Sequence, residues 1–188
     1  MRMLTVSPPA SEPLTLDEAK AVVRQDFSIE DGLLSSIISS ARARVETFTR
    51  RRLISQQVQL RLDGLPASIT IPCDPIISLG AVTYLDPDGV TQEMPDIGLR
   101  LVESSLPARL VWDRNSSLPD IMAGQDTVRI TLTVGYGADA SAIPSDLLAA
   151  VRLLVAHYFV NRSAVIEGGA TEIPLGVQDL LLPHVLWV

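Results

Sequence analysis

Residues 41–63, ARARVETFTRRRLISQQVQLRLD, contain the change of pattern that decides the fold. Up to Phe48 the apolar residues recur every three or four positions, as on one face of a helix that is predicted to end near Arg52. From Val58 onward apolar and polar residues alternate, which is typical of a half-buried strand. One chain therefore joins a helical segment to a strand-rich segment.

Towards the N-terminus the pattern predicts two helices. The longer one begins at Ser28 or Glu30, and its apolar stripe begins at Leu33. Before it, Thr15 and Glu18 have the spacing of a capping box, in which the Thr15 side chain caps the first turn. A short helix is therefore expected to begin after Thr15.

Towards the C-terminus the sequence first predicts short strands separated by Pro, Gly and Asp, at residues 69–71, 80–85, 90–94, 99–102, 109–112 and 127–134. The clearest hairpin crosses Asp86–Gly89, where Gly89 can adopt a positive φ. Helical spacing returns from Pro144 to Val160, and a loop at residues 163–173 leads to a last short helix at residues 175–182.

The predicted fold class is therefore α+β, with a helical bundle formed by both ends of the chain and an inserted antiparallel β domain. The bundle comprises residues 1–54 and 138–188. The insert comprises residues 55–137 and is expected to be a sandwich or a small barrel.

Composition excludes several classes of protein. The 188 residues are 47% hydrophobic and 20% charged, as in a folded protein rather than a disordered one. The net charge of −7 repels DNA, so any contact with nucleic acid is expected to be local. The single Cys73 excludes an internal disulfide. No signal peptide is visible, and the longest apolar stretch, residues 147–160, is too short for a bilayer, so no membrane association is expected.

Two apolar features predict protein partners. The helix at residues 144–160 is apolar nearly all round, so its second face is expected to meet either the β insert or a neighbouring subunit. The tail from Leu181 to Val188 is apolar and contains Trp187, so it has more to gain from a protein surface than from water. The alternative is a tail folded back onto its own domain.

Five arginines form one local basic cluster, Arg42, Arg44, Arg50, Arg51 and Arg52, with only Glu46 as a counter-charge nearby in the sequence. Two interpretations remain open. The cluster faces phosphates, or it interacts with the dipole at the C-terminus of its own helix.

Other motifs have simpler explanations. Residues 133–137, TVGYG, match a potassium-channel filter but lack flanking membrane helices, so a strand end and a turn are expected. Asp86 and Asp88 lack the later acidic ligand of a calcium loop. His157 and His184 have no metal-ligand spacing, and no catalytic motif is present. No metal, no cofactor and no enzymatic activity are expected.

The order of signals around the third helix is more specific. A strand is followed by Gly135-Tyr136-Gly137, Ile143-Pro144, the apolar helix with His157-Tyr158 and Asn161-Arg162, and then residues 173–177, IPLGV. Together with residues 13–20, PLTLDEAK, and the helix exit from Ala41-Arg42 to Arg52-Leu53-Ile54, this arrangement resembles the head-tail connector (adaptor) family of tailed bacteriophages, prophages and gene transfer agents.

The resemblance covers about half the chain and implies a structural role. A homo-oligomeric ring, commonly of twelve subunits, would lie beneath the portal protein, meet a stopper or other tail-side protein, and let DNA pass through its bore without sequence-specific binding. The location would be the neck of a phage-like particle assembled in the bacterial cytoplasm. The alternatives are a monomeric binding domain and an enzyme with a scattered active site.

These implications assign three sets of residues. The portal-docking set is Leu180, Leu181, Leu182, Val185, Leu186, Trp187 and Val188. The subunit-interface set is Leu153, Ala156, His157 and Val160. The DNA-facing set is the arginine cluster, Arg42, Arg44, Arg50, Arg51 and Arg52.

Overall fold

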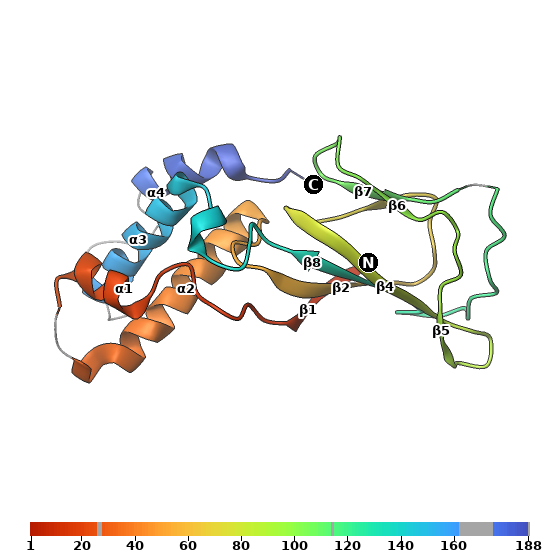
Figure 1. Ribbon diagram of the computed structural model, residues 1–188, viewed down its shortest axis with the longest axis horizontal. Coiled ribbons are helices and arrows are strands. Elements are labelled where there is room, and N and C mark those ends of the chain that lie inside the picture. The colour runs from red at the N-terminus through yellow and green to blue at the C-terminus, as the bar shows by residue number, and fades with distance from the viewer. Residues whose placement is uncertain (26–27, 114, 162–174, 188) are drawn as a thin grey trace. The chain divides into compact units, whose positions relative to one another are not determined.

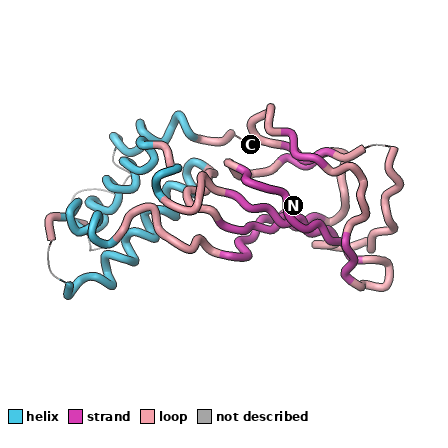
Figure 2. The backbone as a smooth tube through the Cα atoms, in the orientation of Figure 1, coloured by secondary structure: helices cyan, strands magenta, loops and turns pink. Residues whose placement is uncertain are grey.

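The structure is a computed structural model that describes residues 1–25, 28–113, 115–161 and 175–187 (Figure 1). Its contacts divide the chain into two compact units. Residues 10–54 and 136–185 form a helical unit, and residues 1–9, 55–135 and 186–188 form a β unit. Helices and strands are coloured separately in Figure 2. The α+β prediction is confirmed.

The helical unit contains four α-helices and three short 3₁₀ turns among the described residues. The helices are α1 (Leu16–Val23), α2 (Asp31–Thr49), α3 (Ser145–Val160) and α4 (Leu175–Leu181). The turns are η1 (Ser28–Glu30), η2 (Ala140–Ala142) and η3 (Leu182–His184). The predicted loop at residues 163–173 lies outside the described residues.

Local sequence explains how these helices begin and end. The predicted capping box is confirmed, because the Glu18 N–H donates to Thr15 Oγ1 at 3.2 Å and the Thr15 N–H donates to Glu18 Oε2 at 2.9 Å. Both α1 and α2 end at an arginine in the left-handed conformation, Arg24 and Arg50. Pro144 occupies the N-cap of α3.

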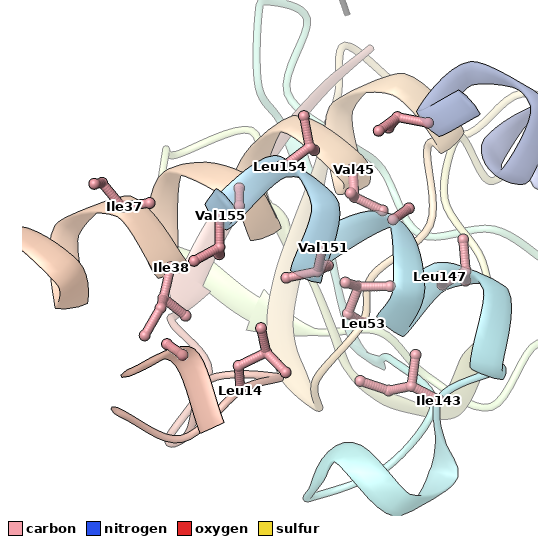
Figure 3. Packing of buried hydrophobic residues seen from close by; sticks show 14 of the residues in the cluster. Leu14, Ile37, Ile38, Val45, Leu53, Ile143, Leu147, Val151, Leu154 and Val155 are labelled. Carbon is pink, nitrogen blue, oxygen red and sulfur yellow. The ribbon is translucent and has the colours of Figure 1, made fainter. Parts of the chain in front are cut away.

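The core of this unit forms where the apolar stripes of the helices meet. Figure 3 shows the close packing of side chains from α2, such as Ile38 and Val45, with Val151 and Leu154 of α3. Leu53, which follows α2, is fully buried in the same cluster. Burying side chains of this size contributes about 1.5–3 kcal/mol each, so this packing holds the helices together.

The β unit contains two antiparallel sheets. The five-stranded sheet has the order β1-β2-β8-β4-β5, and the three-stranded sheet has the order β3-β7-β6. The strands are β1 (Arg2–Ser7), β2 (Gln56–Leu62), β3 (Ile69–Thr70), β4 (Ile76–Leu85), β5 (Thr91–Glu93), β6 (Arg100–Val102), β7 (Arg109–Val111) and β8 (Val128–Val134). Alternate residues of β2 and β8 are buried against both β3 and β7 in one cluster.

The predicted hairpin is confirmed between β4 and β5. Thr83 pairs with Glu93 and Leu85 with Thr91, and Gly89 in the turn has a φ of +79°. The Asp86 carboxylate accepts hydrogen bonds from the Asp88 and Val90 N–H groups, so it stabilises the turn.

The predicted glycine turn is confirmed after β8. Residues 133 and 134 of the TVGYG motif end that strand, and Gly135 has a φ of +126°. A Cβ at Gly137 would lie 2.7 Å from the Ala142 Cβ, so close packing as well as the turn favours glycine there.

The first nine residues correct the predicted domain boundary. They were expected in the helical bundle, but Arg2–Ser7 forms strand β1, which pairs antiparallel with β2. The strand is short, and Pro8 and Pro9 follow it directly. A six-residue segment without strict alternation carries little strand signal, and only pairing with β2 stabilises it.

Candidate assembly surface

The third helix buries one apolar face and exposes another. Its buried side chains include Leu147, Val151, Leu154 and Phe159, which pack in the core of the helical unit. On the other side, Leu153 is 48% exposed and Val160 is 78% exposed. An apolar helix face of this kind is favourable only when another surface covers it.

The exposed residues follow the helical repeat. Ala149, Leu153, Ala156 and Val160 are spaced by four, three and four positions, so they form one stripe along α3. Ala149 and Ala156 are half-buried. We call these four residues the α3 stripe. It contains three of the four predicted subunit-interface residues.

The fourth predicted interface residue, His157, lies beside the stripe and is half-buried. Its Nδ1 lies 3.1 Å from the Asn161 side-chain nitrogen, and that nitrogen also donates to the His157 carbonyl at 3.0 Å. With Nδ1 as the acceptor, Nε2 carries the proton. That buried nitrogen has no hydrogen-bond partner among the described residues.

Three arginines of the predicted DNA-facing set, Arg42, Arg51 and Arg52, form hydrogen bonds or ion pairs within the helical unit. Arg42 donates to both oxygens of Glu12 at 2.7 and 3.2 Å, and to Glu46 at 3.3 Å. Burial by itself lowers the pKa of Arg42, but pairing with Glu12 and Glu46 raises that pKa above its ordinary value. Glu12 precedes α1, so sequence proximity did not reveal it as a counter-charge.

The buried Glu46 carboxylate is the centre of this arrangement. Only 3% of Glu46 is exposed. Its Oε2 pairs with Arg42 and Arg52, each at 3.3 Å, and its Oε1 accepts the Leu53 N–H at 3.0 Å. The carboxylate thereby binds the end of α2 to the segment that leaves it. Sequence analysis missed this role, although the Arg42–Glu46 spacing of four was a signal for one of the pairs.

Arg51 donates a hydrogen bond to the C-terminal segment of the chain. Its Nε donates to the His184 carbonyl at 2.7 Å, and the His184 Nε2 lies 2.9 Å from Asp146 Oδ2. Three segments distant in sequence therefore meet at η3: the end of α2, the start of α3 and the tail. The hydrogen bond from His184 is the largest cause of a lowered pKa at Asp146.

Arg44 and Arg50 differ from the other three. Both are exposed, and neither has a hydrogen bond or an ion pair with a described residue. Of the predicted DNA-facing set, these two guanidinium groups are the ones available to an external anion.

The predicted portal-docking residues divide into buried and exposed groups. Leu181 is fully buried in the helical unit, and Leu186 is buried and groups with the β unit. Leu180 and Val185 are half-buried. Leu182 and Trp187 are exposed, with Trp187 at 77%, and Val188 lies outside the described residues. The chain thus folds part of its tail onto itself and presents Trp187 and Leu182.

The contact between Asp146 and His184 gives a pH prediction. The pKa of Asp146 is lowered in the folded state, so its contribution to stability is complete above the ordinary carboxyl pKa and is lost as the pH falls through the folded value. Asp146→Asn should lower the urea midpoint of unfolding at pH 7, and the difference from the parent should shrink steadily in acid. A difference that grows in acid would contradict this assignment.

Two features are absent from the described part of the chain. No helix there combines the length and the apolarity needed to cross a membrane. In the same residues, no three His, Cys, Asp or Glu side chains come together as metal ligands.

Comparison with known proteins identifies the family. Residues 13–84 match the family model described as phage gp6-like head-tail connector protein. A solved structure of the neck of an empty gene transfer agent (GTA) particle, with C6 symmetry, contains a chain that is 30% identical to this one. The alignment covers 100% of this chain and 97% of that chain, with a TM-score of 0.83. The protein is a member of the head-tail connector family.

Two further structures contain similar chains. One is the virion of a native gene transfer agent particle, and the other is the neck of a native particle with C12 symmetry. Each matching chain is 29% identical, with a TM-score of 0.80, and the alignment again covers 100% of this connector and 97% of that chain. No significant match is found among curated proteins. The connector family is structural rather than enzymatic, and the resemblance first seen in the sequence is confirmed.

Proposed function

We propose that this connector is a structural subunit of a ring in the neck of a phage-like or gene transfer agent particle. The ring lies beneath the portal, joins the DNA-filled head to the tail, and lets DNA pass through its bore. The observation that carries this proposal is the match along the whole chain, at 30% identity, to a chain from a GTA neck. The C6 and C12 symmetries of the two neck structures favour a ring of repeated subunits.

The α3 stripe is the proposed contact between subunits. Leu153 and Val160 expose large apolar side chains on a helix whose opposite face is already packed. A neighbouring copy that covers this surface removes apolar area from water, which stabilises the contact by about 25 cal/mol per Å² of apolar surface buried. The half-buried His157, which lies beside the stripe, belongs to the same proposed contact.

The exposed part of the tail is the proposed portal contact. Trp187 and Leu182 offer apolar surface, while Leu181 and the bond from Arg51 to His184 anchor the segment that carries Leu182. Deleting residues 180–188 would also remove the buried Leu181 and Leu186. A single substitution is therefore the sharper test.

Trp187→Ala should leave the free energy of unfolding nearly unchanged and weaken binding to the purified portal by about 2 kcal/mol, or about 30-fold, as expected for a tryptophan at the centre of an interface. Titration calorimetry with portal protein measures the effect. Asp179→Ala, an exposed substitution on α4, is the matched control and should bind as the parent does. Equal affinity of the Trp187 variant and the parent would remove this residue from the portal contact.

The proposed contact with passing DNA is limited to Arg44 and Arg50. The other three arginines of the cluster already have partners: Arg42 binds Glu12, Arg52 binds Glu46, and Arg51 donates to the His184 carbonyl. Two exposed cations on a chain of net charge −7 provide weak attraction without base recognition, which suits a duplex that moves through the bore.

The function is tested in cells that produce the particle. Deleting the gene should yield DNA-filled heads without tails, and cryo-electron microscopy of complemented particles should locate the subunit between portal and tail. The other proposed partners are the portal and a stopper or other tail-side protein, and assembly is proposed to occur in the bacterial cytoplasm. Complete particles from the deletion strain would refute the proposal.

A further inference from the structure

The basic residues of the β unit fall into two groups. The sequence of that unit contains six arginines and no lysine, and five of the six lie among the described residues. Arg2, Arg61 and Arg129 lie opposite one another on β1, β2 and β8 of the larger sheet. The other two, Arg100 and Arg109, lie on the smaller sheet. Both are exposed, and neither has an ion pair with a described residue, so they are available to an external anion.

These two arginines lie on the outward face of the smaller sheet. Arg100 of β6 is opposite Val111 of β7, and Arg109 is opposite Val102. Leu110, between Arg109 and Val111, is fully buried in the core of the β unit. Because successive side chains of a strand point to opposite faces, Arg100 and Arg109 share the face that points away from the core.

A hollow of about 830 Å³ lies on this face, comparable in size with the clefts that hold small molecules. We call it the small-sheet hollow. Its charged lining residues are Arg100, Arg109 and Asp113, and the Asp113 carboxylate accepts the Asn115 N–H at 3.0 Å. Its apolar lining residues are Ala67, Val111 and Trp112. A fitting occupant therefore combines negative charge with an apolar side chain.

The β4–β5 hairpin has this complementary chemistry. Residues 86–96 contain four carboxylates and no basic residue. Residues 87–93, which we call the exposed hairpin, are all exposed, and Val90 among them is 53% exposed. The Asp88 and Glu93 carboxylates have no hydrogen bond or ion pair with a described residue. The exposed hairpin thus presents free negative charge beside an uncovered apolar side chain.

The turn of the hairpin is held in one conformation. The Asp86 carboxylate accepts hydrogen bonds from the Asp88 and Val90 N–H groups at 3.1 and 2.9 Å, and from the Gln92 side chain at 2.9 Å. In Figure 1 the hairpin projects from the larger sheet, away from β6 and β7. A loop that is already ordered loses less conformational entropy on binding, so this hairpin is suited to insertion into a partner.

We propose that the exposed hairpin of one copy of this chain inserts into the small-sheet hollow of a second copy. Val90 covers the apolar lining, and Asp88 and Glu93 meet Arg100 and Arg109 of the partner subunit. A contact between two different patches repeats from copy to copy and generates a ring when its rotation closes. This inference rests on the proposed assembly of many copies in one particle, and it adds a contact to that of the α3 stripe.

The lining of the hollow favours a second copy over nucleic acid. Phosphates could meet the two arginines, but a phosphate backbone offers little apolar surface to cover Val111 and Trp112. It would also approach Asp113 and a chain of net charge −7. The exposed hairpin supplies both the carboxylates and the apolar side chain, and every copy in a ring carries one hairpin and one hollow.

Charge reversal tests the contact in cells that produce the particle. Asp88→Lys combined with Glu93→Lys reverses the hairpin, and Arg100→Glu combined with Arg109→Glu reverses the hollow. Each reversal alone is expected to lower the yield of tailed particles by at least about tenfold, because every junction between copies then repels. The chain with all four substitutions should recover most of the parent yield, because the attraction returns with opposite signs.

Matched controls make the same changes of charge at exposed sites elsewhere. Asp120→Lys with Asp179→Lys matches the reversal of the hairpin, and Arg2→Glu with Arg24→Glu matches the reversal of the hollow. Both controls should give the parent yield. Unfolding curves measured for every variant check that a lower yield does not come from a lower stability.

Cross-linking shows whether the contact joins two copies. Asp88→Cys with one affinity tag and Arg109→Cys with another are produced together in the same cells, so a disulfide between them joins two chains by construction. The native Cys73 is only 1% exposed. Oxidised particles are expected to contain a linked pair that carries both tags and separates with reductant. Asp120→Cys produced together with Arg109→Cys is the control and should give no such pair.

Three results would overturn the hairpin contact: the parent yield from either reversal, a chain with four substitutions that assembles no better than the two reversals, or no linked pair in particles that contain both tagged chains. Binding to duplex DNA that is lost on reversal of the hollow, but not in its control, would make nucleic acid the occupant and would also overturn it. Particles that lack the subunit altogether would instead refute the proposed function.

Discussion

Glu46→Ala should lower the free energy of unfolding by about 3 kcal/mol or more, the largest expected effect of a single substitution on stability. The change leaves Arg42 and Arg52 without the carboxylate they share, and it removes the acceptor of the buried Leu53 N–H. Removing one partner of a buried ion pair costs more than the pair contributed, because the remaining charges stay partly desolvated. Urea unfolding followed by circular dichroism measures the loss.

Two control variants show whether the loss of stability comes from the charge of Glu46 and from its buried site. Glu46→Gln keeps an oxygen that can accept the Leu53 N–H but removes the charge, so its loss should be smaller than that of Glu46→Ala. Asp179→Ala removes an exposed carboxylate and should change the free energy of unfolding by less than about 0.5 kcal/mol. If Glu46→Ala unfolds at the same urea concentration as the parent, the carboxylate does not hold α2 to the following segment.

Leu153→Asp combined with Val160→Asp should abolish head–tail joining while the chain still folds. Both side chains are exposed in the single chain, so two carboxylates are tolerated there. In the proposed ring they would be buried without partners, at a cost of several kcal/mol per contact. We expect the yield of tailed particles to fall by at least about a hundredfold, which corresponds to about 2.7 kcal/mol. Counting complete particles by electron microscopy measures the effect.

The matched control is Leu33→Asp. Leu33 is 41% exposed in the first turn of α2, close to the exposure of Leu153, and an acidic residue is favourable near a helix N-terminus. Its particle yield should equal that of the parent. Unfolding curves of all variants must coincide, so that a lost function reports on contacts between subunits. A normal yield from the double α3 variant would exclude the α3 stripe as the contact.

Much of the fold was predictable because it depends on short-range patterns. The spacing of Thr15 and Glu18 identified the start of α1, and the change of period after Phe48 located the junction between helix and strand. The hairpin at Asp86–Gly89 followed from turn chemistry, which involves adjacent residues only. In each case the residues that determine the structure lie within about four positions of one another.

The errors and omissions have a common cause. Strand β1 depends on pairing with residues fifty or more positions away, and its own six residues carry little signal. The counter-charge Glu12 lies thirty positions before Arg42. His184 contacts Asp146 across 38 positions. None of these partners is identified by local spacing.

The candidate site was predictable in part. Sequence analysis selected α3 because the helix is apolar on all sides, and the structure separates its buried face from the stripe that includes Leu153 and Val160. Sequence analysis grouped five arginines as one cluster. In the structure, three of them, Arg42, Arg51 and Arg52, bind other residues of the same chain. Only the tertiary structure decides which guanidinium groups already have partners.

Periodicity, turn residues and the order of motifs were thus sufficient to establish the α+β class, most of the helices and strands, and the connector family of this protein. These properties depend on hydrophobic burial and local backbone preference, both of which repeat along the chain. The three-dimensional fold alone decided the role of Glu46, the anchoring of the tail through His184, and the alignment of Arg2, Arg61 and Arg129 across three strands. Such contacts join segments that are distant in sequence, and a hydrogen bond or an ion pair requires its partners within a few ångströms.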